Sequence, residues 1–339
     1  MRIFYNSHAV AALGIIGTLL VYGSEAALLV LVLAILEISL SMDNAVVNAS
    51  VLKNMTPLWQ KRFMTWGILI AVFAMRLVFP ILIVAFATDL NVSDVMSMAL
   101  NSPGEYSQYL NAAHPLIASF GGVFLLMVGL SFLLDEARDV YWIGYLEKRL
   151  QLVGKIDAVN TILSLTVLMS ISAFVPESIH TSVLTGGIWG LFLYGLVSSL
   201  DSLFSVSDDE PSVTDAAKRG GLMAFLYLEI LDASFSFDGV IGAFAITQAV
   251  PIIMLGLGIG AWYVRSLTVY LVNKGTLDQY IYLEHGAHYA ILTLAILMLA
   301  STLHEIPEAI TGFTGATLIG LSLLSSIRHN KHQAALANS

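Results

Sequence analysis

Long apolar runs recur along the whole chain, and charged or turn-forming residues separate them. Runs of about twenty residues have the length that a helix needs to cross a bilayer. They predict ten helices, near residues 8–23, 26–52, 66–88, 115–134, 157–175, 186–204, 220–247, 250–272, 287–303 and 307–327. The first run also resembles a signal peptide, because Met1 and Arg2 precede a short apolar segment. We therefore expect an all-α fold, a polytopic membrane protein of about ten transmembrane helices.

Composition agrees with a membrane protein and narrows its chemistry. Hydrophobic residues make up 57% of the chain and charged residues 12%, with a mean hydropathy of +0.82. Cysteine is absent, so disulfides and thiolate metal sites are excluded and a bound metal must use oxygen or imidazole ligands. The net charge of -9 and the lack of a basic stripe exclude nucleic acid as a partner. The expected partners are the lipid bilayer and a metal ion, and a homo-oligomer is compatible with the sequence.

The basic residues predict the orientation of the helices. If both termini are cytoplasmic, the inside segments hold 13 of the 15 Lys and Arg residues, as the positive-inside rule requires. The other two, Arg76 and Arg265, lie within predicted helices. We therefore expect a multi-pass protein of a bacterial cytoplasmic membrane with both termini inside. In this arrangement the helices near 26–52 and 220–247 run in opposite directions.

These two antiparallel helices carry nearly the same acidic motif. The first copy is Glu37-Ile-Ser-Leu-Ser-Met-Asp43-Asn44, and the second, 195 residues later, is Asp232-Ala-Ser-Phe-Ser-Phe-Asp238-Gly239. A charge at a helix centre costs roughly 2.5 to 3.5 kcal/mol on insertion scales, so these acids indicate function. The pattern predicts an inverted-topology repeat within a single membrane domain, 1–339. Its halves are 26–134 and 220–305, with 135–219 linking them and 306–339 forming a C-terminal helix and tail.

The depth of each acid suggests how the motifs meet. Counting from the helix ends places Glu37 and Asp232 together near the midplane, Asp43 toward the cytoplasm and Asp238 toward the exterior. On an unbroken helix, residues six apart differ by about 120° in azimuth and about 9 Å in height. One ion therefore requires both motifs or a broken helix. Asn44 and Gly239, which follow the second acids, are the expected positions of such breaks.

The residues around the motifs predict a site for a hard cation. The candidate metal ligands are Glu37, Asp43, Asn44, Glu229, Asp232, Asp238, Ser41 and Ser236, and Ser39 and Ser234 offer further oxygens. Five carboxylates against the charge-balancing Arg76 and Arg265 leave a formal surplus of three negative charges. A divalent cation, protons or both would offset this surplus, and oxygen ligands suit Mn²⁺, Ca²⁺ or Mg²⁺. The alternative is that the acids only pair with the arginines and hold the helices together.

Two other polar segments are weaker candidates. His304-Glu305-Ile306-Pro307-Glu308 departs from a zinc-protease motif, because Glu308 replaces the second His and Pro307 breaks the helix. We expect an outside turn there. Glu284, His285 and His288 could form a cytoplasmic vestibule or a proton relay, or could be interfacial polar residues.

The two acidic motifs also resemble a known family. Glu37-x-x-x-Ser41-x-Asp43-Asn44, with an Asp-x-x-x-Ser-x-Asp counterpart from Asp232, is similar to the TerC-like integral membrane proteins, and closest to their domain-of-unknown-function 475 branch. The resemblance spans about residues 26 to 305. It implies a relationship to LysE-type exporters and to proteins linked to manganese export or tellurium resistance. The resemblance places Glu37, Asp43, Asn44, Asp232 and Asp238 on the acidic positions of that family.

Three functions are compatible with this sequence. The first is a secondary exporter of a divalent cation as substrate, with Mn²⁺ as the expected ion and proton exchange through the same carboxylates. The second is a metal-binding structural or chaperone-like membrane protein. The third is an intramembrane aspartyl enzyme, which the symmetry of the motifs disfavours because a catalytic pair needs one acid and one base. We therefore expect no enzyme, no catalytic residues and no cofactor.

Overall fold

Helices make up nearly all of the described chain. The computed structural model describes residues 2–88, 90–156, 158–205 and 213–337, a few of them by their backbone alone, and these ranges contain no strand. The N-terminal part contains α1 (Arg2–Leu40), α2 (Met42–Leu52), α3 (Pro57–Arg62), the π-helices η1 (Phe63–Gly67) and η2 (Ile70–Val78), α4 (Phe79–Thr88), α5 (Val92–Asn101) and α6 (Pro103–Leu134). The remainder contains α7 (Gly144–Gly154), α8 (Val159–Phe174), α9 (Glu177–Ser205), α10 (Val213–Ile246), α11 (Val250–Asn273), α12 (Thr276–Gln279), α13 (Leu283–Ser301) and α14 (Glu308–Ala337).

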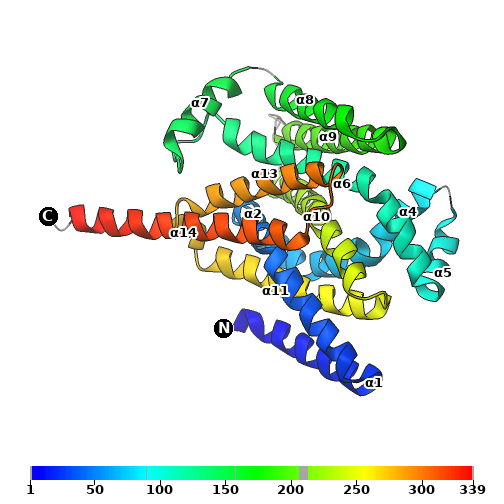
Figure 1. Cartoon of the computed structure of the whole chain (residues 1–339). Coiled ribbons are helices and arrows are strands. Elements are labelled where there is room, and N and C mark those ends of the chain that lie inside the picture. Colours follow the sequence, from blue (N-terminus) through cyan, green and yellow to red (C-terminus); the bar gives the residue numbers. More distant parts are fainter. Residues whose placement is uncertain (1, 89, 157, 206–212, 338–339) are drawn as a thin grey trace.

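The helix α1 contains the first predicted span and most of the second. Gly23 interrupts it with φ 87° and ψ -179°, a conformation that glycine adopts readily because it lacks a Cβ. The chain folds back at this point, and Figure 1 shows the two blue arms of α1 meeting at a sharp bend. The predicted boundary between the first two spans is thus a tight turn within one continuous segment.

The described helices fit a polytopic membrane protein. Six of them are long and apolar enough to cross a membrane, and the number rises to eight if each of two bent helix pairs counts as one span. The sequence predicted ten spans. The two additional spans arise because α1 is divided at Gly23 into two arms and because α10, which carries the second acidic motif, is counted as well. The prediction of an all-helical membrane protein is therefore confirmed.

Two segments expected to be loops are helical. Residues 92–101 form α5 and residues 103–114 extend the start of α6, although both lie between the predicted helices 66–88 and 115–134. The cause is a stripe of buried apolar side chains at helical spacing, which the polar residues between them obscured: Val95, Ala99, Tyr106, Leu110 and Ala113. The linking segment after α6 likewise contains the short helix α7.

Corresponding helices of the two halves make corresponding contacts with the opposite half. The first motif helix, α1, packs on α11, which follows the second motif; the second motif helix, α10, packs on η2, which follows the first. In the same way α2 contacts α13 while α10 contacts α6, and α6 and α13 pack on each other. Helices α8 and α9 lie against α6, and α14 lies against α13 (Figure 1). This exchange symmetry is what an inverted repeat produces.

Candidate functional site

The two acidic motifs lie side by side in antiparallel register. Asn44 Nδ2 donates a hydrogen bond to Asp232 Oδ1 over 2.6 Å, although the residues are 188 positions apart. Glu37 lies seven residues before Asn44, and Gly239 lies seven residues after Asp232. These two residues are also neighbours, because Glu37 Oε2 lies 3.1 Å from the position of a Cβ added to Gly239. The depth count predicted Glu37 opposite Asp232. The structure instead sets the start of each motif against the end of the other.

A helix break separates the two acids of the first motif. Helix α1 ends at Leu40 and α2 begins at Met42, and Ser41 between them has φ -105° and ψ 19°. Ser41 Oγ donates to Glu37 Oε1 over 3.1 Å. The expected break positions, Asn44 and Gly239, both lie inside helices. The break is therefore three residues earlier than predicted, and α10 has none at its motif.

Asp43 lies in the first turn of α2, directly after this break. Its side chain is 5% exposed, and its Oδ1 accepts a hydrogen bond from the backbone N–H of Asn44 over 2.9 Å. Its Oδ2 faces α14, 3.3 Å from the place that a Cβ on Gly315 would take. No described basic side chain forms an ion pair with it. The positive end of the α2 dipole favours the carboxylate, but the described side chains provide no countercharge for Asp43.

Glu37, the first acid of the first motif, pairs with an arginine. Arg76 in η2 donates through Nη2 to Glu37 Oε1 and through Nη1 to the carbonyl of Ala71. Ala71 lies five residues before Arg76, which is the hydrogen-bonding interval of a π-helix. Gly260 of α11 leaves room for the Glu37 side chain, since a Cβ there would lie 2.5 Å from the Cβ of Glu37. The charge of Glu37 is thus balanced within its own half.

Asp232, the first acid of the second motif, pairs with the corresponding arginine. Arg265 in α11 is 1% exposed and donates over 2.9 Å to Asp232 Oδ2 and over 3.0 Å to each oxygen of Glu229. It also donates to the carbonyl of Phe63 in η1 over 3.3 Å, and its guanidinium lies 4.1 Å from the centre of the Phe63 ring. A side chain at Gly67 would occupy the space of this guanidinium. Both π-helices thus offer a carbonyl to a buried arginine.

These pairs divide the predicted surplus of negative charge. Arg76 and Glu37 cancel, whereas Arg265 faces both Glu229 and Asp232. Among the described side chains, one surplus charge therefore belongs to the Arg265 cluster and one to Asp43. Glu229 was predicted as a metal ligand, but both of its oxygens accept hydrogen bonds from Arg265 in this arrangement. Arg76 and Arg265 act as the expected counter-ions.

Several buried polar atoms near the motifs have no hydrogen-bond partner in the described chain. They are Ser236 Oγ, Asn44 Oδ1, both Nδ2 and Oδ1 of Asn48, and the Nε atoms of Arg76 and Arg265. Asn48, 1% exposed, lies four residues after Asn44 and so on the same face of α2. A buried amide without a protein partner is costly, so a bound water or a ligand would have to satisfy these atoms. The sequence analysis overlooked Asn48, although an amide one turn beyond an acidic motif in an apolar run was the signal.

Two other serines of the motifs do not contribute free oxygens. Ser39 is exposed on α1 and donates to the carbonyl of Ile35 over 2.8 Å. Ser234 donates to the carbonyl of Ile230 over 3.0 Å. Both hydroxyl groups therefore return to the preceding turn of their own helix, as serine commonly does within a helix.

Asp238 continues helix α10, but its side chain lies outside the described part of the structure. Among the described residues, no three His, Asp or Glu side chains are grouped closely enough to hold one metal ion. The described part of the candidate site is therefore Asp43, with the amides of Asn44 and Asn48 and the hydroxyl groups of Ser41 and Ser236.

Two hollows, each with a mainly apolar wall that also carries several polar groups, lie at opposite ends of α10 and α13. One, of about 570 Å³, is formed near the end of α2 and the starts of α10 and α13, and is lined among others by Ser50, Asn54, Gly221, Ala224, Glu284 and His288. The other, of about 750 Å³, is lined among others by Asn111, His114, Gly242, Ser301, Glu305 and Thr311. The segment from 302 to 307, between α13 and α14, is a turn as predicted. The motifs lie between these two hollows along α10.

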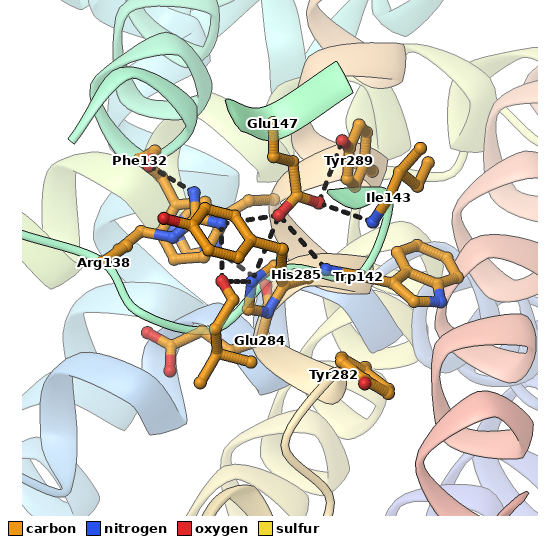
Figure 2. A network of polar contacts seen from close by, with 12 residues as sticks. Phe132, Arg138, Trp142, Ile143, Glu147, Tyr282, Glu284, His285 and Tyr289 are labelled. Carbon is orange, nitrogen blue, oxygen red and sulfur yellow. Dashed lines mark hydrogen bonds and ion pairs between the residues drawn. The ribbon is translucent and has the colours of Figure 1, made fainter. Parts of the chain in front are cut away.

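A second polar cluster surrounds Glu147 of α7, and Figure 2 shows it. Glu147 is fully buried and accepts from Arg138 over 3.0 Å, from Tyr289 over 3.1 Å, and from the backbone N–H groups of Trp142 and Ile143. This residue was missed, because a single acid in a short amphipathic segment looks like a solvated charge.

The histidines of α13 lie next to this cluster. His285 donates from Nε2 to the carbonyl of Val140 over 2.9 Å, while the ring of His288 stacks on Phe132 with 3.6 Å between centroids. His288 and Glu284 line the first hollow, whereas His285 packs into the cluster. The three residues named together in the sequence therefore have different surroundings.

Comparison with known proteins places the chain in a family. No curated protein and no solved structure matches it. A family model described as "Protein of unknown function (DUF475)" matches residues 42–333, from the start of α2 through the second acidic motif to α14. The matched range contains Asp43, Asn48 and the Arg265 cluster, and it covers most of the chain. The chain therefore belongs to the DUF475 family.

Proposed function

We propose that this protein is a secondary transporter that exports a divalent cation, with Mn²⁺ as the substrate, in exchange for protons. The substrate would be bound between the two motifs by Asp43 and Asp238 together with amide and hydroxyl oxygens. Carboxylate and amide oxygens without thiolate are the ligands that hard divalent cations prefer. The proposal agrees with the resemblance of the motifs to TerC-like proteins and LysE-type exporters. It places the protein in the cytoplasmic membrane, with its termini inside.

The observation that carries this proposal is the buried carboxylate of Asp43 at a helix break. Arg76 and Arg265 are already occupied by Glu37, Glu229 and Asp232, so they leave Asp43 without a countercharge. A buried carboxylate that lacks a partner must be protonated or must bind a cation. Discontinuous helices near the midplane are typical of the substrate sites of secondary transporters.

The two hollows support movement of the cation rather than static binding. They approach the motifs from opposite ends of α10 and α13, and each carries carboxylate, imidazole or amide groups at its wall. Alternating access requires such a pair of approaches, of which one opens while the other closes. The motif helix of each half packs on a helix of the other half, and this symmetric arrangement would support such a movement.

The test is Mn²⁺ flux into proteoliposomes that contain the purified full chain and a metal-sensitive dye. We expect uptake by the wild type in the presence of an opposing proton gradient. Asp43→Asn, Asp238→Asn and Glu37→Gln should abolish it while the protein still inserts. Ser39→Ala is the matched control, because Ser39 lies in the first motif but is exposed and bonds only to its own helix.

Two results would contradict the proposal. One is wild-type flux in all three carboxylate variants, which would leave the acids with a purely structural role. The other is Mn²⁺ binding by the wild type without any flux, which would favour the structural or chaperone-like alternative. If the wild type cleaved a membrane substrate and the Asp43→Asn variant did not, the result would favour the third alternative, an intramembrane aspartyl enzyme.

A further inference from the structure

Helix α7 lies across the ends of the membrane helices. It makes an angle of 103° with α8, which is one of the bent pairs of candidate spans. Gly154 at its end packs directly against the backbone of Leu134, the last residue of α6, with no room for a side chain. Figure 1 shows α7 at the end of the bundle where α6 finishes and α8 begins. Helix α7 is therefore nearly perpendicular to α8, and where α8 crosses a bilayer α7 would follow its surface.

The inner face of α7 is held by the buried Glu147. Its carboxylate is bound by Arg138 from the preceding loop and by Tyr289 of α13, and Figure 2 shows these contacts converging on it. On the same side, Gln151 accepts from Tyr141 over 2.8 Å and donates to the carbonyl of Asp135 over 3.0 Å. These bonds fix the rotation of α7 about its axis. The opposite face must therefore point away from the protein.

That outward face is apolar along its centre. Tyr145, Leu152 and Ile156 have exposed fractions of 72%, 64% and 58%. At about 100° per residue, Tyr145 and Leu152 lie roughly 20° apart around the helix axis, and Ile156 follows two residues after the end of the helix at Gly154. Such large apolar side chains outside the bundle need a cover, and the protein itself provides none among its described residues. A bilayer surface at the same level would cover them.

The same face is bordered by cations. Lys148 and Lys155, seven residues apart, lie along one edge of the apolar stripe, and both are exposed. Arg149 lies on the other edge, about 40° from Tyr145 around the helix axis, and its guanidinium is 4.3 Å from the centre of the Tyr145 ring. Glu147 is the single acid of α7 and is buried. The outward face of this helix is therefore apolar and cationic, with no exposed carboxylate of its own.

We propose that this face of α7 binds the anionic phospholipids of the leaflet at this end of the bundle. Tyr145, Leu152 and Ile156 would enter the boundary between headgroups and acyl chains, while Lys148, Arg149 and Lys155 contact the phosphates. Apolar residues flanked by lysine and arginine are the pattern of a helix that lies in the interface. Basic residues next to a membrane surface attract anionic lipids, and tyrosine is enriched at this depth. The proposal does not depend on what the protein transports.

The first experiment measures the lipids that the purified full chain retains from a mixture of phosphatidylglycerol and phosphatidylcholine, by native mass spectrometry. Lys148→Gln/Arg149→Gln should lower the retained phosphatidylglycerol by about tenfold relative to phosphatidylcholine, because each cation near the surface adds several-fold to binding. The matched control is Arg328→Gln/Lys331→Gln, which removes two exposed cations from α14. Both double variants leave Glu147 and its contacts in place.

The second experiment uses the absence of cysteine in this chain. A spin label on Leu152→Cys should be accessible to oxygen and protected from a water-soluble relaxation agent in nanodiscs that contain phosphatidylglycerol. A label on Gln333→Cys in the exposed tail of α14 should show the reverse. Equal phosphatidylglycerol retention in both double variants, or a Leu152→Cys label as exposed to water as the control, would overturn the proposal.

Discussion

Asn44 of α2 donates a hydrogen bond to Asp232 of α10 over 2.6 Å, and this bond joins the two acidic motifs. Asp232 at the same time accepts from Arg265 through its other oxygen. The bond thus connects the helix break of the first half to the charged cluster of the second. Any movement of α2 relative to α10 must stretch or break it.

The contribution of this bond can be measured with a double-mutant cycle. Hydrogen bonds between membrane helices are worth about 0.6 kcal/mol on average and up to about 1.7 kcal/mol. Because Asp232 is charged, we expect a coupling of about 1 to 2 kcal/mol between Asn44→Ala and Asp232→Ala. Equilibrium unfolding in mixed detergent micelles measures it. Additive losses in the double variant would show that the two residues are energetically independent.

Replacing Asn48 should separate stability from activity. Both amide atoms lack a partner among the described residues. The variant Asn48→Leu replaces this polar group by an apolar side chain with the same branching and the same number of heavy atoms, and should raise the free energy of unfolding by about 1 to 3 kcal/mol. If the amide binds the substrate, the same variant should lose Mn²⁺ flux in proteoliposomes. A variant that is both more stable and fully active would show that Asn48 has no part in transport.

Replacing Arg76 should lower the free energy of unfolding, because the buried carboxylate of Glu37 loses its partner. The Arg76→Gln variant leaves this carboxylate without its partner, and breaking a buried pair costs about 3 to 5 kcal/mol. The double variant Arg76→Gln/Glu37→Gln should regain most of that loss, because no buried charge remains. Unfolding in mixed micelles measures both, with Arg149→Gln on the exposed face of α7 as the control. Equal losses in the single and double variants would contradict the charge argument.

Gly67 should tolerate no side chain. A Cβ at this position would lie 2.6 Å from Oε1 of Glu229 and would displace the guanidinium of Arg265. We expect Gly67→Ala to lower the free energy of unfolding by about 1 to 3 kcal/mol through overpacking. Gly195→Ala in α9 is the control, because nothing lies within 4 Å of its added Cβ. It should be neutral or stabilising, as alanine favours a helix over glycine. Similar effects at both sites would show that the cluster adapts to the added group.

Much of the fold was predictable from local patterns. Apolar runs of membrane length locate the helices, and the distribution of Lys and Arg makes the two motif helices antiparallel. The pairing of Arg76 and Arg265 with the acids was foreseeable too, since buried charges need partners. The helical character of 92–114 was not recognised, because polar residues between Val95, Ala99 and Tyr106 conceal the apolar stripe.

The details of the candidate site depended on packing. Six residues separate the acids of each motif in the sequence, but nothing local indicates that the helix breaks at Ser41 and not at Asn44. The register of the motifs also differs from the depth count, because Gly239 and Gly260 allow close approach of Glu37. The buried position of Glu147 likewise follows from contacts with α13, which lies more than a hundred residues away in the sequence.

The sequence by itself determined the membrane-spanning helices, the antiparallel motifs and the excess of intramembrane acid, because hydropathy and charge act residue by residue. Only the tertiary structure decided which acids are neutralised. Arg76 and Arg265 reach Glu37, Asp232 and Glu229, and no other cation in the described part of the chain pairs with Asp43 beside the helix break. That selection depends on the geometry of helices far apart in the chain, since an ion pair forms only where two side chains meet at bonding distance.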